Sequence, residues 1–324
     1  MKSDAEQFPI VLRDLARKYR LGADRTRWFR FAFHLTDVRN AAQILRQGKV
    51  SCRVDLESSG GIPLDIASPK VIARTGHAVK DCVRMYFRPL TPTQYRWEGI
   101  RPKEHLWEGS HCPVPIFFLF DLPSILMRDD CSFSESNQAK LGFNQLFTTA
   151  DELASFDFGK IFHVDRLSDE EKRDIISHRN AELIVKKELD LTSLQYIYCR
   201  TPGEKQTLMH LLTDELRRVW GNKIQVETGS SLFYREWVFV ETAVLNENST
   251  TFAFSPDPKR SGPFQLEIQC SGARFESYTQ ETFNASGKFQ VGFHEPLWQY
   301  NVELTLDGHL SYAGSFDGKE DFPF

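Results

Sequence analysis

The strongest constraint on the fold is a change of pattern near residue 221 of this 324-residue chain. Before that point, apolar residues recur at both helical and strand spacing. After it, short alternating runs are separated by turns such as Asp257-Pro258 and Ser261-Gly262, which is typical of strands alone. We therefore expect an α+β domain over residues 1–221 and a small all-β domain, sandwich or barrel, over residues 222–324.

The two parts also differ in charge. The chain has 40 Lys and Arg and 44 Asp and Glu residues, and six of the basic but fourteen of the acidic ones lie from Gln225 onward. A mildly basic first part is compatible with nucleic-acid binding without establishing it, because clustering matters more than the sum. The acidic second part is expected to bind a partner or to regulate, for example by occupying a basic face of the first.

The chain is expected to be a cytoplasmic protein with no membrane partner. No apolar run approaches the ~18 residues that cross a bilayer. The polar, acidic start from Met1 to Gln7 is unlike a secretory leader. Six cysteines occur without a C-x-x-C pair, which indicates neither a zinc site nor a disulfide framework, and no metal is expected.

Periodicity and breakers predict the elements in order. The strands of the first part should lie at 28–36, at 81–87, closed by a breaker run to 95, at 114–120, as a central strand, and at 194–199. Its helices should lie at 9–19, at 37–48 with a cap, at 122–126, at 169–178 with many charges, and at 204–220 as one helix. An irregular connection is expected at 51–80, and a polar turn at 133–139 should open a further helix. The second part should contain strands at 232–245, 251–254, 264–270, 289–293 and 298–306.

Glu182 is the most informative polar residue. It follows Ala181 and opens the apolar run Leu183 to Val185, where a partly buried strand should begin. A buried carboxylate at such a position is either paired or functional. The segment from His178 to Val185 alone favours a solvent-facing Glu182. His34, near the end of the 28–36 strand, would by itself more often be structural than functional.

Four separated pieces together change this weighting. They are Phe33-His34-Leu35-Thr36 with Asn40 and the 44–48 segment, Ile66-Ala67 leading to Arg74, the 81–87 strand with Pro89, Pro92 and Tyr95, and Arg179 to Val185. In order and spacing they resemble the DarT family, the DNA ADP-ribosyltransferase toxins of bacterial toxin–antitoxin systems, over about residues 28–200. The turn at 133–137 also fits.

The resemblance implies an ADP-ribosyltransferase-like split β-sheet with flanking helices, with NAD in a cleft between two small antiparallel sheets. Cleaving the bond between nicotinamide and ribose builds oxocarbenium character, which a nearby carboxylate stabilises. The catalytic candidates are Glu182, for this role, and Arg74, for the diphosphate or the target base. The candidates for binding NAD are His34, Thr36, Asn40, Tyr86 and Tyr95, the two tyrosines by stacking on nicotinamide.

The expected acceptor is a base in single-stranded DNA, because a base inside a duplex cannot reach a buried ribose. Phosphate contacts and stacking are assigned to Arg84, Arg88, Arg96 and Trp97, although these are equally compatible with an ordinary charged face. The family further implies a toxin, a role in phage defence and an antitoxin partner with a macrodomain.

Two alternatives remain open at this point. The same chemistry could act on RNA or protein, because surfaces that the sequence does not reveal choose the acceptor. The chain could also be a non-catalytic module that binds nucleic acid or a partner protein, since a fold does not fix a function. An ion pair that buried Glu182 far from any cleft would favour this second alternative.

Overall fold

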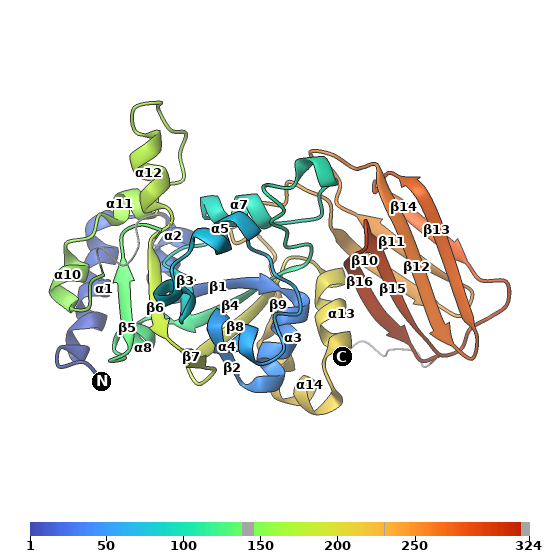
Figure 1. The fold of residues 1–324 in the computed structure, drawn as a ribbon, viewed down its shortest axis with the longest axis horizontal. Coiled ribbons are helices and arrows are strands. Elements are labelled where there is room, and N and C mark those ends of the chain that lie inside the picture. Colours follow the sequence, from blue (N-terminus) through green and yellow to red (C-terminus); the bar gives the residue numbers. More distant parts are fainter. Residues whose placement is uncertain (138–145, 230, 319–324) are drawn as a thin grey trace.

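A computed structural model describes residues 1–137, 146–229 and 231–318 (Figure 1). Its first part is built on one seven-stranded sheet in the order β5-β6-β3-β1-β4-β8-β9. The strands are β1 (Phe31–Asp37), β3 (Cys82–Tyr86), β4 (Pro115–Asp121), β5 (Cys131–Ser134), β6 (Glu182–Lys186), β8 (Leu194–Cys199) and β9 (Ile224–Val226). All neighbours are antiparallel except β8 and β9, which are parallel.

The sheet is weakly joined in its middle. β1 pairs with β4 from Phe31 to Asp37, and β3 pairs with β6 along its whole length. Between β1 and β3, the register contains the single pair Phe33↔Tyr86. The expected split sheet is therefore present as two well-paired halves that meet at one pair of residues.

Helices flank this sheet. Helix α1 (Phe8–Tyr19) contacts α8 (Leu122–Leu126), α10 (Ala150–Ala154) and α11 (Phe158–Ile161), and aromatic rings fill the space between them and the sheet. Helix α3 (Val38–Gln47) begins at the Asp37 cap and ends at Gly48, as expected. None of the helices in the described part of the chain combines the length and apolar character that a membrane crossing requires.

Several element boundaries differ from the sequence expectation. Residues 23–28 form helix α2 (Ala23–Trp28), so the first strand begins three residues later. The connection expected to be irregular carries β2 (Lys49–Ser51), which pairs with β7 (Glu188–Asp190), and three short helices: α4 (Arg53–Ser58), α5 (Pro69–Arg74) and α6 (His77–Lys80). The segment after residue 139 that was expected to be helical falls on residues that the structure does not describe.

Two further differences come from capping. Thr91 accepts a hydrogen bond from the Gln94 N–H and Pro92 follows it, so the breaker run starts helix α7 (Pro92–Trp97). Thr213 caps a new helix in the same way, so the helix expected at 204–220 is two: α13 (Pro202–Leu211) and α14 (Asp214–Trp220). The charged helix is α12 (Lys172–His178). Short 3₁₀ turns lie at Ala5–Gln7, Lys103–His105 and Gly221–Lys223.

The second part is a β-sandwich. One sheet contains β10 (Val240–Asn246), β11 (Ser249–Phe254) and β14 (Lys288–Gly292), and the other contains β12 (Phe264–Gly272), β13 (Phe275–Phe283), β15 (Tyr300–Leu306) and β16 (His309–Phe316). Side chains of both sheets share one core. Because β9 belongs to the first sheet, the sandwich starts at Val240, later than residue 222.

The sandwich packs against helix α13 of the first part through strands β10 and β16 (Figure 1). The Thr201 hydroxyl donates to the Val240 carbonyl at 2.7 Å, and the Ala313 N–H donates to the Thr207 hydroxyl at 3.1 Å. Beside them the Arg200 guanidinium contacts the carboxylates of Glu204 and Glu98, and all three side chains are buried. The attachment therefore contains buried polar contacts as well as apolar packing.

Candidate active site

Glu182 lies at the first position of β6 and is completely buried. The Arg84 guanidinium, on the neighbouring strand β3, contacts both of its oxygens. Arg84 Nε donates to Glu182 Oε2 at 3.2 Å, and Arg84 Nη2 pairs with Glu182 Oε1. Arg84 Nη2 also donates to Asn137 Oδ1 at 3.2 Å. The carboxylate is thus held in a fixed orientation by a planar donor.

Arg84 differs from Glu182 in its access to solvent, because 27% of its side-chain surface is exposed. Burial opposes the charged form of Arg84, but the adjacent Glu182 carboxylate more than compensates, so the pKa of Arg84 is raised. The phosphate contact expected for Arg84 stays a prediction; in this structure its guanidinium is engaged by Glu182 and Asn137. The sequence does not reveal the pairing, because 98 residues separate the two partners.

His34 lies where the ladder between β1 and β3 ends. Its Nδ1 is 3.1 Å from the Arg84 carbonyl oxygen. A carbonyl only accepts, so Nδ1 carries the proton of this hydrogen bond. Burial lowers the pKa of His34, which favours the neutral ring. Nε2 is then an acceptor on the far edge of the imidazole, suited to a hydroxyl group such as those of ribose.

Tyr86 connects the two halves of this site. Its Cα pairs with Phe33 on one side and with Glu182 on the other. Directly paired residues place their side chains on the same face of a sheet, so Tyr86 and Glu182 share a face. Burial, followed by the Glu182 charge, raises the pKa of Tyr86 to about 12. The phenol therefore remains protonated at neutral pH and can serve as a hydrogen-bond donor.

Asn40 and Thr36, which were also expected to bind NAD, are engaged within the protein or buried in it. Asn40 Nδ2 donates to the Leu64 carbonyl at 2.8 Å, and the Leu64 N–H donates to Asn40 Oδ1 at 3.0 Å. Asn40 thereby fixes the connection that leads to α5. Thr36 is buried in β1, opposite Ile116 of β4.

Arg74 ends helix α5 and is exposed. Within the described residues it makes no hydrogen bond or ion pair. A guanidinium in this position is available to a ligand, whereas the connection that carries it is anchored at Leu64 by Asn40.

Tyr95 lies on α7, where 38% of its surface is exposed. Its hydroxyl accepts from Lys259 Nζ at 2.6 Å, and its ring meets Tyr234 edge to face at a centroid distance of 5.1 Å. Lys259 belongs to the connection between β11 and β12, so Tyr95 also contacts the second part of the chain.

The other expected strand contacts divide into buried and accessible groups. Arg88 is buried, and its Nη1 donates to the carbonyls of Ile161 at 2.9 Å and His163 at 2.6 Å. Burial lowers the pKa of Arg88 to about 9. The phosphate contact expected for Arg88 stays a prediction; in this structure its guanidinium is buried and donates to backbone carbonyls.

Arg96 is only partly buried, with its guanidinium 4.1 Å from the centre of the Trp107 ring. Trp97 packs against the main core. Of the four expected strand contacts, Arg96 is thus the one whose cation lies at the surface without an acidic partner in the described structure.

Sequence reasoning missed the residues that support this site. Thr93 donates to Asn180 Oδ1 at 2.8 Å, and Asn180 Nδ2 donates to the Ile176 carbonyl, also at 2.8 Å. These bonds tie α7 to the end of α12, two residues before Glu182. The Asn180 amide directly before a buried strand was the available signal, since a buried amide needs partners.

The arrangement places a fixed carboxylate, a guanidinium, a neutral imidazole and a protonated phenol around the junction of β1, β3 and β6. Such groups can orient hydroxyls and stabilise a developing positive charge. Glu182 lies in a buried ion pair, which would favour a non-catalytic module if it lay far from any cleft. The pair sits at the junction itself, however, with His34 and Tyr86 beside it.

Comparisons with known proteins identify the family and the fold. Residues 33–234, more than half of the chain, match the family described as ssDNA thymidine ADP-ribosyltransferase, DarT. DarT of Thermus sp. 2.9 in complex with ADP-ribosylated ssDNA is similar in fold, with a TM-score of 0.50 and 17% sequence identity. That match covers 63% of this chain and 96% of the Thermus chain.

Structures of the same Thermus protein with carba-NAD⁺ and with NAD⁺ each give a TM-score of 0.47, at 17% and 15% identity, and cover 63% of this chain and 97% of theirs. The comparison with curated protein sequences gave no match. The sandwich lies beyond the matched residues. The chain belongs to the DarT family of NAD-dependent ADP-ribosyltransferases that act on single-stranded DNA.

Proposed function

We propose that Glu182 is the catalytic carboxylate of this enzyme and that Arg84, His34 and Tyr86 are its immediate partners. The observation that carries the proposal is the ion pair between Glu182 and Arg84 beside the one-pair junction of β1 and β3. This arrangement brings together residues that are far apart in the sequence. Among them are His34 and Glu182, which belong to the segments that carry the family resemblance.

In the proposed reaction, the bond between nicotinamide and the ribose C1′ breaks and nicotinamide leaves with the electron pair. The Glu182 carboxylate stabilises the positive charge that develops on the ribose. A ring nitrogen of thymine then bonds to C1′, and its proton passes to Glu182 or to solvent. His34 Nε2 accepts from a ribose hydroxyl, and Arg74 contacts the diphosphate or the base.

Glu182 is occupied by Arg84 in the present structure, so the proposal requires Arg84 to move. Its exposed part gives it a path toward solvent. The NAD diphosphate offers a replacement anion, and the exchange would free the carboxylate when the substrate is bound. Tyr86 and Tyr95 are proposed to contact nicotinamide, and Arg96 a DNA phosphate.

Incubation with NAD and matched DNA and RNA oligonucleotides, followed by intact-mass measurement, tests the proposal. We expect one ADP-ribose on single-stranded DNA that contains thymidine, none on DNA without thymidine and none on RNA. Glu182→Ala should lower the rate by about 10²–10³-fold, as loss of one transition-state contact does. Glu188→Ala, an exposed glutamate of β7, is the matched control and should keep the wild-type rate.

Two outcomes would contradict the proposal. If the Glu182→Ala variant transfers ADP-ribose at the wild-type rate, Glu182 is not the catalytic carboxylate. If RNA is labelled as strongly as DNA, single-stranded DNA is not the specific acceptor. Loss of NAD without labelling of either oligonucleotide would favour a protein acceptor or hydrolysis.

The biological setting is part of the same proposal. By family membership, we infer a cytoplasmic toxin that acts in phage defence, opposed by an antitoxin whose macrodomain removes the modification. Induced expression in bacteria should arrest growth, Glu182→Ala should abolish the arrest, and co-expression of an active macrodomain hydrolase should relieve it. Growth arrest by Glu182→Ala as severe as that of the wild type would refute a toxin based on transfer.

A further inference from the structure

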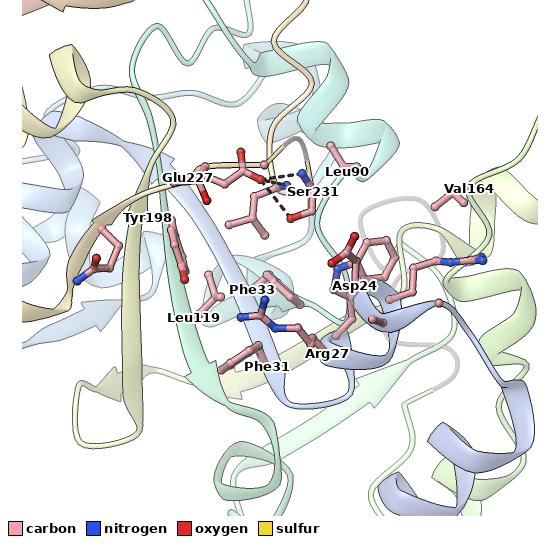
Figure 2. Close-up of a pocket in the computed structure, with 18 of the residues that line it drawn as sticks. Asp24, Arg27, Phe31, Phe33, Leu90, Leu119, Val164, Tyr198, Glu227 and Ser231 are labelled. Atoms are coloured by element: carbon pink, nitrogen blue, oxygen red, sulfur yellow. Dashed lines mark hydrogen bonds between the residues drawn. The ribbon is translucent and has the colours of Figure 1, made fainter.

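A pocket of about 760 Å³ lies apart from the Glu182 ion pair and is lined by none of the residues assigned to it. It is bounded by helix α2, strands β1, β4 and β8, and residues 225–229, 231 and 232 (Figure 2). Its floor is apolar and aromatic, formed by Phe31, Phe33, Leu119 and Tyr198. Arg25 and Arg27 enter from α2.

The pocket lies beside the junction that holds the Glu182 ion pair. Phe33, in the floor, pairs with Tyr86, and Tyr86 pairs with Glu182. Paired residues share a face, and neighbouring strands lie about 4.8 Å apart, so Phe33 and Glu182 are separated by roughly 10 Å across the sheet. Leu90, four residues after Tyr86, also lines the pocket.

The lining suits a nucleotide. A base of any kind can stack on flat apolar and aromatic side chains, and guanidinium groups donate hydrogen bonds to a phosphate. Figure 2 shows Arg27 extending across the floor toward Leu119 and Phe33. Of the two acidic residues that line the pocket, Glu227 is buried, and its Oε1 accepts from the N–H groups of Ser231 at 2.7 Å and Leu232 at 2.8 Å. Asp24 is exposed at the rim.

We propose that this pocket binds the nucleotide next to the acceptor thymidine in the single-stranded DNA substrate and so sets the sequence context of the reaction. The inference rests on the proposed function of Glu182. The alternative occupant is the adenylate half of NAD, which has the same chemistry. Side-chain alternation along β1 favours the DNA strand: Phe31 and Phe33 line the pocket, whereas the NAD candidates His34 and Thr36 occupy the alternate positions, which face the other side of the sheet.

The test compares Arg27→Ala and Tyr198→Leu with Arg30→Ala. Arg30 is an exposed arginine three residues beyond Arg27 that does not line the pocket. Each protein is first checked for an unchanged melting temperature. Binding of fluorescein-labelled single-stranded DNA is then measured without NAD. Transfer rates are measured on oligonucleotides that carry one thymidine and each of the four bases at every flanking position.

We expect both pocket variants to bind DNA roughly tenfold more weakly, a typical effect of one lost stacking or phosphate contact. They should also flatten the base preference at one flanking position, while Arg30→Ala retains the wild-type pattern. Wild-type affinity and wild-type preference in both pocket variants would overturn the proposal. So would an increase in the KM for NAD with unchanged DNA binding, which would assign the pocket to the adenylate.

The binding measurement separates this inference from the proposed function. If the wild type transfers nothing but binds DNA through Arg27 and Tyr198, the reaction assignment fails while the pocket assignment stands. If transfer occurs and the two pocket variants match Arg30→Ala in affinity and in pattern, the pocket assignment fails alone.

Discussion

Two buried arginine–glutamate groups serve the molecule differently. Arg84 and Glu182 pair at the junction of the two halves of the first sheet, and Arg84 remains 27% exposed. Arg200 contacts Glu204 and Glu98 beneath the sandwich, where Arg200 and Glu204 are completely buried and Glu98 is 2% exposed. The contacts are similar, but only the first group has a side chain that reaches solvent.

In the second group, backbone N–H groups also donate hydrogen bonds to a carboxylate. Glu98 accepts from the N–H of Tyr234 at 3.1 Å and from the N–H of Arg235 at 2.9 Å. All its charges are therefore satisfied by the chain itself, as expected for a structural network. Burial of an ion pair is thus no sign of function by itself, and access of one partner to a ligand distinguishes the two cases.

The largest expected effect is on stability and breaks the structural group. Glu204→Leu should lower the free energy of unfolding by about 3–5 kcal/mol, because it leaves a buried guanidinium with one carboxylate partner fewer. Glu182→Leu should cost less, because Arg84 can turn toward water. Urea denaturation of both variants at one pH checks this, and equal losses would remove the distinction between the groups.

The next effect concerns the pH profile of the reaction. Arg84→Gln removes the cation that contacts the Glu182 carboxylate in the substrate-free enzyme, so the acidic limb of kcat/KM, which reports the free enzyme, should move toward higher pH. Arg200→Gln should leave that limb in place in whatever fraction stays folded. Rates between pH 4 and pH 9 decide the matter, and an unmoved limb in Arg84→Gln would argue against Glu182 as the titrating group.

A smaller effect is expected at His111, a buried polar residue outside both groups. Neither of its ring nitrogens has a hydrogen-bond partner in the described structure, and its ring centre lies 4.4 Å from that of His309 in β16. Burial, followed by the charges of His309 and Arg101, lowers the pKa of His111 to about 3.

An unfolded histidine takes up a proton near pH 6.5, and the folded His111 does not. Stability should therefore fall as the pH drops from about 6.5 toward about 3, by about 1.4 kcal/mol per pH unit for this one proton. His111→Phe should remove that part of the slope, measured by urea denaturation at pH 5.5 and 6.5. Replacement of the exposed His294 is the control, and an identical slope in His111→Phe would contradict the assignment.

The smallest effect is expected at an exposed pair. Lys49 Nζ and Glu188 Oε2 are 2.6 Å apart between β2 and β7, and both side chains are largely exposed. Glu188→Gln should leave the unfolding transition unchanged within error, since water screens exposed pairs. A clear loss of stability would mean that the short distance between the charges, and not their exposure to solvent, determines how much an ion pair contributes to the free energy of unfolding.

Local signals predicted much of the fold. Asp37 and Gly48 mark the two ends of α3, and the strand 194–199 is found at its expected bounds. Helices whose caps lie inside other patterns were missed, as at Thr91 and Thr213. The edge strand β13, mostly exposed, carries little alternation, and the sequence did not reveal it.

The candidate site was only half predictable. Glu182 and His34 were candidates from the motifs, and the structure places His34 next to β3 and Glu182 at the start of β6, paired with Tyr86 of β3. The partner of Glu182 could not be predicted, because the pairing of β3 with β6 is a long-range contact. Arg84 and Arg88 look alike in sequence, yet one meets a carboxylate and the other meets backbone carbonyls.

The segment from Glu227 to Phe239 has a consequence for any engineered fragment of this enzyme. It starts at the end of β9, supplies one wall of the pocket and the backbone donors that close the Glu98 network, and runs directly into β10. A gene truncated at codon 221 would therefore encode a protein without that wall. A fragment that keeps both the pocket wall and the Glu98 network must extend past Arg235 and provide a substitute surface for α13.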